Sequence, residues 1–282
     1  MGKIHRKIVA AGVCCLMAGM LTGCGSDTTK ITEGMQLVET LDYQGALNAF
    51  DEAEAQKENS RLIARGRGIA SMGLTEYDQA VEYFTQALEL SDGWVQNVDY
   101  DMNYYLAAAY TKNGQPAEAK KVYDAILGLK PEEKDAYFLR GSAELELGDY
   151  QKAYLALEEA KGKGGVDSYL YLGKAYAATG DYNYASSVYS NYLSKQGPDA
   201  EIYNQLGLCE MAKKDYQKAL EAFQAGKQIE GNSLMQTLSF NEIVAYEYLQ
   251  DYQKAAVLLK AYLQNYPDDQ AAIREQQFLS TR

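Results

Sequence analysis

The chain has 282 residues, of which 47% are apolar and 23% charged, a composition typical of a folded protein rather than a disordered one. Its 39 acidic and 27 basic residues give a net charge of −12 at pH 7, which disfavours binding to the phosphate backbone of nucleic acids. The one histidine, His5, lies in the N-terminal leader, so the rest of the chain lacks the imidazole of Ser-His and Cys-His enzymes and of common zinc sites. We therefore predict no nucleic-acid binding, no metal site and no cofactor.

The first 23 residues have the features of a secretory signal. Three basic residues are followed by an apolar run over residues 8–21, which is too short to span a bilayer comfortably. The run ends in LTGC, and this order of features resembles the lipobox of bacterial lipoproteins, in which the cysteine is lipidated after cleavage just before it. The resemblance implies a diacylglyceryl anchor on Cys24. A membrane anchor that is not cleaved, or an ordinary signal with a chance cysteine, are the alternatives.

Residues 24–32 are polar after the cysteine, and we predict a lipidated residue followed by a short tether. Removal of a leader with three basic and no acidic residues takes the net charge to −15. Cys14 and Cys15 would leave with the leader and Cys24 would carry lipid, so Cys209 would be the only free thiol and no internal disulfide could form. Other repeats have alanine at the position of Cys209, which predicts a small buried side chain rather than a redox centre.

From residue 33 to residue 267 the sequence repeats itself. The segment DYQKA occurs three times, with relatives DYQGA, EYDQA and DYNYA, and the alanines at its last position are 32 to 39 residues apart. These alanines are Ala46, Ala80, Ala119, Ala153, Ala185, Ala219 and Ala255. Glycine stands twelve residues before five of them, and Phe, Tyr or Leu stands four residues after each. The pattern resembles the tetratricopeptide repeat (TPR), and it implies seven helix-turn-helix units stacked in a right-handed α-solenoid.

Elementary helix chemistry predicts the same unit. Gly148 is suited to the left-handed conformation that ends a helix, and the carboxylate of Asp149 is suited to cap the next one. In that second helix Tyr150, Ala153 and Leu157 share one face, which we expect to be buried. Ala153 has to be small because the two helices of a unit approach closely there.

Three segments depart from the regular repeat. Residues 268–282 follow Pro267, start with Asp268-Asp269 and continue in a helical pattern, and we predict a capping helix followed by a tail. The segment KGKGG, residues 161–165, follows a helix and not a strand, so we interpret it as a flexible joint rather than a phosphate-binding loop. Trp94 lies in the longest repeat and would either anchor a partner or hold that longer loop against its neighbours.

First helices line a groove in this family, and equivalent positions form rows across it. The first row consists of Tyr104, Phe138, Leu170, Asn204 and Phe240. The second, three residues earlier in each unit, consists of Asp101, Asp135, Asp167, Glu201 and Thr237. An apolar row beside an acidic row suits a basic or amphipathic peptide. Acidic residues in the first turn of a helix are also favoured by its dipole, by about 0.3 to 1 kcal/mol each, without any ligand.

The sequence thus predicts an all-α, non-enzymatic scaffold that binds envelope proteins or peptides. We expect it on the outer face of the cytoplasmic membrane, or on the periplasmic face of a membrane where the cell has two. A related hypothesis is an assembly-factor lipoprotein for outer-membrane or cell-wall machinery. A third is a cell-wall hydrolase or transferase with paired carboxylates, which 39 acidic residues leave open.

Overall fold

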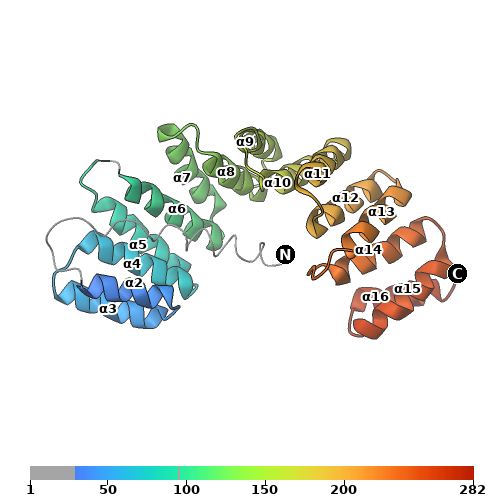
Figure 1. Cartoon of the computed structure of the whole chain (residues 1–282), viewed down its shortest axis with the longest axis horizontal. Helices are drawn as coiled ribbons and strands as arrows, with labels where there is room; N and C mark the ends of the chain where they lie inside the picture. Colours follow the sequence, from blue (N-terminus) through green and yellow to red (C-terminus); the bar gives the residue numbers. More distant parts are fainter. Residues whose placement is uncertain (1–28, 95) are drawn as a thin grey trace. The chain divides into compact units, whose positions relative to one another are not determined.

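The computed structural model describes residues 29–94 and 96–282, and these residues form fifteen helices and no strand (Figure 1). The predicted signal and Cys24 lie outside the described residues. None of the helices in the described part of the chain is both long and apolar enough to cross a membrane. Seven pairs of helices, each joined by a short turn, are followed by one more helix, so the predicted all-α array of seven helix-turn-helix units is confirmed.

The described chain divides into two compact units after Gly165, directly behind the KGKGG segment. In each pair we call the first helix A and the second helix B. The N-terminal unit holds four pairs: α2 (Thr29–Glu39) and α3 (Tyr43–Ala55), α4 (Ser60–Gly73) and α5 (Tyr77–Glu89), α6 (Asn97–Lys112) and α7 (Pro116–Leu129), α8 (Lys134–Glu146) and α9 (Tyr150–Gly162).

The C-terminal unit begins at Val166 and holds the remaining seven helices. Its three pairs are α10 (Ser168–Ala178) and α11 (Tyr182–Gln196), α12 (Ala200–Ala212) and α13 (Tyr216–Lys227), α14 (Met235–Tyr248) and α15 (Tyr252–Asn265). The last helix, α16 (Gln270–Leu279), packs on α15 and buries Ala272 and Leu279.

The repeated small residues mark the closest contacts inside each pair. All seven alanines that end the DYQKA-like segments have no exposed surface. A Cβ atom placed on Gly68 of α4 would lie only 2.7 Å from Cε1 of Phe84 on α5. Phe84 is itself fully buried and stacks on Tyr105 of α6, with ring centroids 5.3 Å apart. The glycine and the aromatic residue are therefore one packing unit that ties two neighbouring repeats together.

All seven turns within the pairs contain one residue in the left-handed conformation, directly before the first residue of the DYQKA-like segment. Gly148 has a φ of 75°, as predicted, and Asp149 accepts a hydrogen bond from the backbone N–H of Lys152. Only three of the seven turns use glycine at this position. The left-handed residues are Leu41, Thr75, Gly114, Gly148, Gly180, Lys214 and Gln250.

Candidate functional site

In the N-terminal unit, Tyr104 and Phe138 are both half-buried on their A helices. The ring of Tyr104 packs against Tyr123 of α7, with centroids 6.4 Å apart. Its hydroxyl is buried without a hydrogen-bond partner, and burial together with the nearby carboxylates of Glu133 and Asp135 raises its pKa. Tyr104 therefore contributes as much to packing between helices as to the surface of the A helices.

The acidic row has two members in the N-terminal unit, Asp101 and Asp135, and Asp101 is paired with a basic side chain of the same unit. Asp101 accepts a hydrogen bond from Nε of Arg65 on α4 at 3.1 Å, and both side chains are largely buried. Asp101 also lies beyond the first turn of its helix, because α6 begins at Asn97; the first-turn dipole explanation is therefore wrong for this residue. Asp135 lies in the first turn of α8 and is exposed.

In the C-terminal unit, the first row contributes Leu170, Asn204 and Phe240. Leu170 and Phe240 are half-buried, and Phe240 packs against Tyr262 of α15 with centroids 5.7 Å apart. Asn204 is buried and accepts a hydrogen bond from Nδ2 of Asn241 on α14 at 2.9 Å. This hydrogen bond links two neighbouring A helices, and the repeat pattern of the sequence did not predict it.

The acidic row of this unit differs between its two members. Glu201 lies 3.5 Å from Nζ of Lys174 and accepts a hydrogen bond from Gln205 at 3.0 Å. Asp167 precedes α10 and is exposed. The sequence analysis missed Leu208, one helical turn after Asn204 on the same face of α12, which is 42% exposed. We call the surface formed by Asn204, Leu208 and Glu201 the α12 face.

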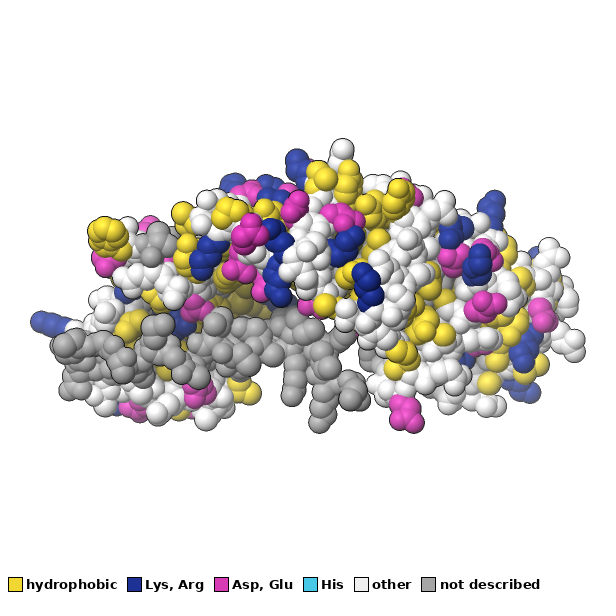
Figure 2. Space-filling view, turned by 45° about the horizontal axis from the view of Figure 1, so that its top comes forward, with side chains coloured by type: hydrophobic (Ala, Val, Ile, Leu, Met, Phe, Trp, Pro, Cys, Tyr) yellow, Lys and Arg dark blue, Asp and Glu magenta, His cyan; other side chains and the backbone are white. Residues whose placement is uncertain are grey.

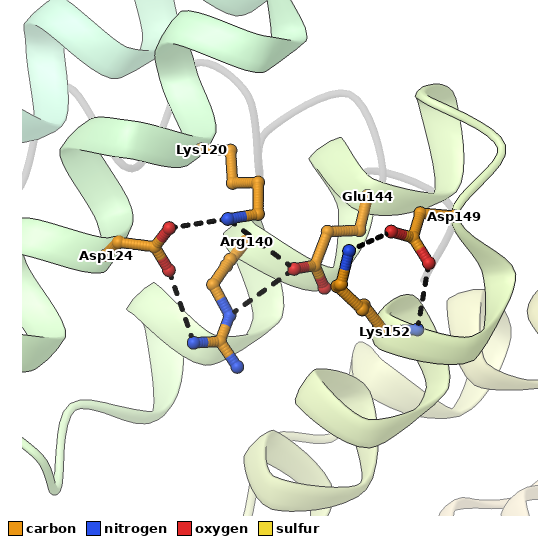
Figure 3. Close-up of polar contacts among 6 residues, drawn as sticks. All are labelled: Lys120, Asp124, Arg140, Glu144, Asp149 and Lys152. Atoms are coloured by element: carbon orange, nitrogen blue, oxygen red, sulfur yellow. Dashed lines mark hydrogen bonds and ion pairs between the residues drawn. The ribbon is translucent and has the colours of Figure 1, made fainter.

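A buried carboxylate joins α7 and α8 of the N-terminal unit (Figure 3). Glu144 stands where three other units have tyrosine, and its Oε1 lies 4.0 Å from both Nζ of Lys120 and Nε of Arg140. The same two cations hold Asp124, at 2.6 and 3.4 Å. Burial raises the pKa of Glu144, and the two cations oppose that effect. Glu144 is buried, whereas its charged neighbours are partly exposed, and the contacts connect α7 with α8. We therefore interpret the cluster as a link between repeats.

A second pair of acidic side chains connects α14 to the last helix. Glu247 is close to Glu275 of α16, and burial together with this neighbouring carboxylate raises the pKa of Glu247 to about 8. In the described residues no group of three or more His, Cys, Asp or Glu side chains is arranged to hold a metal ion. Cys209 is buried, as predicted, and burial raises the pKa of its thiol to about 11, which disfavours the reactive thiolate.

Trp94 lies in the loop between α5 and α6, and 79% of its side chain is exposed. It borders a pocket of about 280 Å³ with walls from the end of α5, the start of α6 and the end of α7. The lining includes Leu88, Tyr100, Ile126 and Leu129. The exposed ring is inconsistent with the interpretation that Trp94 holds the long loop against its neighbours.

Charges of both signs lie among apolar side chains on the face of the molecule shown in Figure 2. Lys30 contacts Glu33 and Glu52 at 2.9 and 2.6 Å, and Arg67 contacts Asp51 and Glu54 at 2.6 and 2.8 Å. Much of the basic charge is therefore paired within the protein, and recognition by one dominant charged patch is not favoured.

Comparisons with known proteins agree with this architecture. A family model described as tetratricopeptide repeat matches residues 31–94, 65–132, 104–167 and 170–233, and a second with the same description matches residues 240–269. The C-terminal part of a TPR protein from Cytophaga hutchinsonii is similar with a TM-score of 0.70 and 20% identity, over 86% of this chain and 98% of that one. A TPR protein from Parabacteroides merdae is similar with a TM-score of 0.64 and 16% identity, over 90% and 98%.

Two curated proteins show what kinds of protein carry similar repeats. A heat-shock cognate co-chaperone of Aspergillus fumigatus is 33% identical over 107 residues, which cover 37% of this chain and 30% of the relative. A photosystem I assembly protein of Prochlorococcus marinus is 27% identical over 105 residues, covering 37% and 52%. The matches thus span about a third to a half of the curated relatives. Because the family model covers most of the described residues, the chain belongs to the tetratricopeptide repeat family.

Proposed function

We propose that the protein is a lipid-anchored, extracytoplasmic scaffold that binds a protein or peptide partner through its A helices. Membership of a family whose repeats bind proteins and peptides supports the binding role. The observation that carries the assignment to a particular surface is Leu208, an exposed leucine on an A helix, next to the Asn204–Asn241 amide pair. An exposed apolar side chain beside fixed polar groups is the combination that peptide-binding surfaces use.

The α12 face favours a partner with an apolar anchor over a purely basic one. Its carboxylate, Glu201, is already paired with Lys174, so a basic ligand would have to displace an internal cation. Asp167, at the start of α10, is the exposed acidic residue of this unit's row and would contribute to contacts with a basic flank. We therefore refine the predicted ligand to an amphipathic segment whose apolar side faces α12.

Site-specific photo-crosslinking in cells tests this proposal. A photoreactive amino acid at Leu208 should capture a protein partner, whereas the same residue at Val257 should not. Val257 is a matched control because it is exposed in the same unit but lies on the B helix α15. Equal capture at both positions, or none at Leu208, would show that the α12 face is not the binding surface.

The membrane location rests on the order of features before Cys24 and is tested separately. Replacing Cys24 by alanine should release the protein from the membrane fraction and abolish incorporation of labelled palmitate. Labelling that persists in the alanine variant would contradict the proposal.

The names of the curated relatives favour a role in assembling other proteins as a second candidate. One is a co-chaperone and the other an assembly protein, and the matches cover 30% and 52% of their lengths. An assembly factor would contact its partner transiently. Crosslinks at Leu208 should then disappear when synthesis of new envelope protein is stopped, whereas those of a permanent scaffold should persist.

A further inference from the structure

The ends of the B helices and the starts of the A helices lie together along one edge of the N-terminal unit, which we call the inter-repeat edge. Glu58, between α3 and α4, accepts hydrogen bonds at 3.0 Å from the backbone N–H groups of Lys30 and Ile31, in the first turn of α2. Arg61, at the start of α4, donates to the carbonyl of Ala87 near the end of α5 at 3.2 Å.

The edge continues through the next two repeats. Arg61 also pairs with Asp99 in the first turn of α6. Nζ of Lys130, just after α7, lies 3.6 Å from the ring centroid of Tyr100 on α6. These contacts place the first turn of α2, the loop between α5 and α6, and the end of α7 on the same edge of this unit.

Three large apolar side chains project from the inter-repeat edge. Trp94 is 79% exposed, Leu129, the last residue of α7, is 60% exposed, and Leu90, just after α5, is 46% exposed. Single exposed leucines are common on protein surfaces, but two of them on the same edge as an exposed tryptophan are the kind of side chains that enter the boundary region of a bilayer.

Chain length then restricts how far the inter-repeat edge can lie from the anchor. Thr29, where α2 begins, is five residues after Cys24, and five residue steps span at most about 17 Å. Because α2 contacts α4 and α4 contacts α6, with neighbouring helices 8 to 10 Å apart, α6 begins about 20 Å along the edge from α2. A lipid on Cys24 would therefore keep the start of α2 within about 17 Å of the membrane, with the edge that carries Trp94 close enough to reach its surface.

We propose that Trp94, Leu90 and Leu129 form a membrane-contact surface that lies in the boundary region of the bilayer holding the lipid anchor. This inference rests on the proposed lipidation of Cys24. The charges near the three side chains are mixed, because Glu89 and Asp92 are exposed beside them and Lys130 is held over Tyr100. Attraction to anionic lipid is thus not the driving force. Apolar contact is sufficient for binding to the bilayer, because the tether keeps these side chains at a high local concentration near its surface.

The protein contains a built-in probe for this contact, since Trp94 is its only tryptophan. The chain from residue 24 onward is coupled through the thiol of Cys24 to a maleimide lipid in phosphatidylcholine vesicles. Cys209 is buried and should not react. Coupling should shift the tryptophan emission to shorter wavelength and allow brominated lipids to quench it. The uncoupled chain, mixed with the same vesicles, should keep the emission of a water-exposed indole.

Matched variants separate membrane contact from tethering alone. A double variant, Leu90→Glu and Leu129→Glu, should lose the emission shift and the quenching while it keeps its helical circular dichroism. The control, Leu147→Glu, changes an exposed leucine at the opposite edge, in the turn between α8 and α9, and should keep both.

Three results would overturn the inference. The first is Trp94 emission that is neither shifted nor quenched in the coupled protein. The second is an equal loss of the emission shift and quenching in the Leu147→Glu control. The third is an emission shift that appears only when an envelope protein is added. Because the coupling is chemical, the outcome does not depend on whether cells lipidate Cys24. Failure of the proposed anchor would appear instead as an unlabelled Cys24 in cells.

Discussion

Replacing Gly68 by alanine tests whether the glycine and phenylalanine positions of neighbouring helices form one packing unit. The added Cβ would lie 2.7 Å from Cε1 of Phe84 and 2.9 Å from Cδ1 and Cζ, whereas ordinary carbon contacts are about 3.5 to 4.0 Å. The ring would have to move by about 0.8 Å or more, and the stacked ring of Tyr105 restricts that movement. Overpacking of this kind costs about 1 to 3 kcal/mol, and the better helix propensity of alanine returns up to about 1 kcal/mol. We therefore expect Gly68→Ala to be about 1 to 3 kcal/mol less stable than a glycine-to-alanine variant in which only helix propensity changes.

Urea unfolding followed by circular dichroism measures this loss, and hydrogen exchange of the amides in α4 and α5 locates it. The control is Gly128→Ala in α7 of the same unit, where an added Cβ meets no atom within 4 Å. That variant should be equally stable or up to about 1 kcal/mol more stable, because only helix propensity changes. Phe84→Leu should largely remove the cost of Gly68→Ala when the two are combined. If Gly68→Ala is as stable as the Gly128→Ala control, the close-packing explanation of the repeated glycines is wrong.

Three further substitutions test other links in the array. Arg61→Ala should destabilise the N-terminal unit by about 2 to 4 kcal/mol in urea unfolding, because it leaves the buried carboxylate of Asp99 without its cation; an effect below that of typical surface changes would refute this. Asp251→Ala should cost about 1 kcal/mol by the same measurement, since its carboxylate caps α15, whereas Asp251→Asn should be nearly neutral. Burial and Glu275 raise the pKa of Glu247 to about 8, above its value in the unfolded chain, so this group favours folding at low pH and that contribution is lost as the pH rises toward 8. Glu247→Gln should raise the thermal midpoint at pH 9 more than at pH 5, and an equal change at both would contradict the assignment.

The repeat fold was predictable because it depends on residues that recur with a fixed period. The alanines of the DYQKA-like segments are all fully buried, and Gly148 and Asp149 form the turn and cap that their chemistry suggested. Periodicity also identified which A-helix positions belong to the same row. These features follow from local geometry that every unit has to satisfy.

The functional surfaces were less predictable because they depend on residues that differ between units. Aligning the rows did not show that Asp101 is paired with Arg65. Arg65 stands at the first-row position of the preceding repeat, and a row of equivalent positions does not show which side chains of neighbouring repeats meet. The position of Leu208 is apolar in four of the six other units, so the sequence pattern did not distinguish an exposed leucine there from a buried one. Leu90 directly follows α5 and Leu129 is the last residue of α7, where the helical periodicity stops. Only the tertiary structure shows that they lie on one edge with Trp94.

The left-handed turns have a consequence for how such an array can evolve. Leu41, Thr75, Lys214 and Gln250 adopt a conformation that costs a residue with a Cβ atom about 1 kcal/mol or more, although glycine fulfils the same role at the other three turns. Helix packing therefore dictates the turn, and the residue identity at this position is free to drift. Each of the four sites retains a stabilising change to glycine that has not been used. A lineage that acquires a destabilising substitution on a binding face could recover the loss at a distant turn, without altering any surface that contacts a partner.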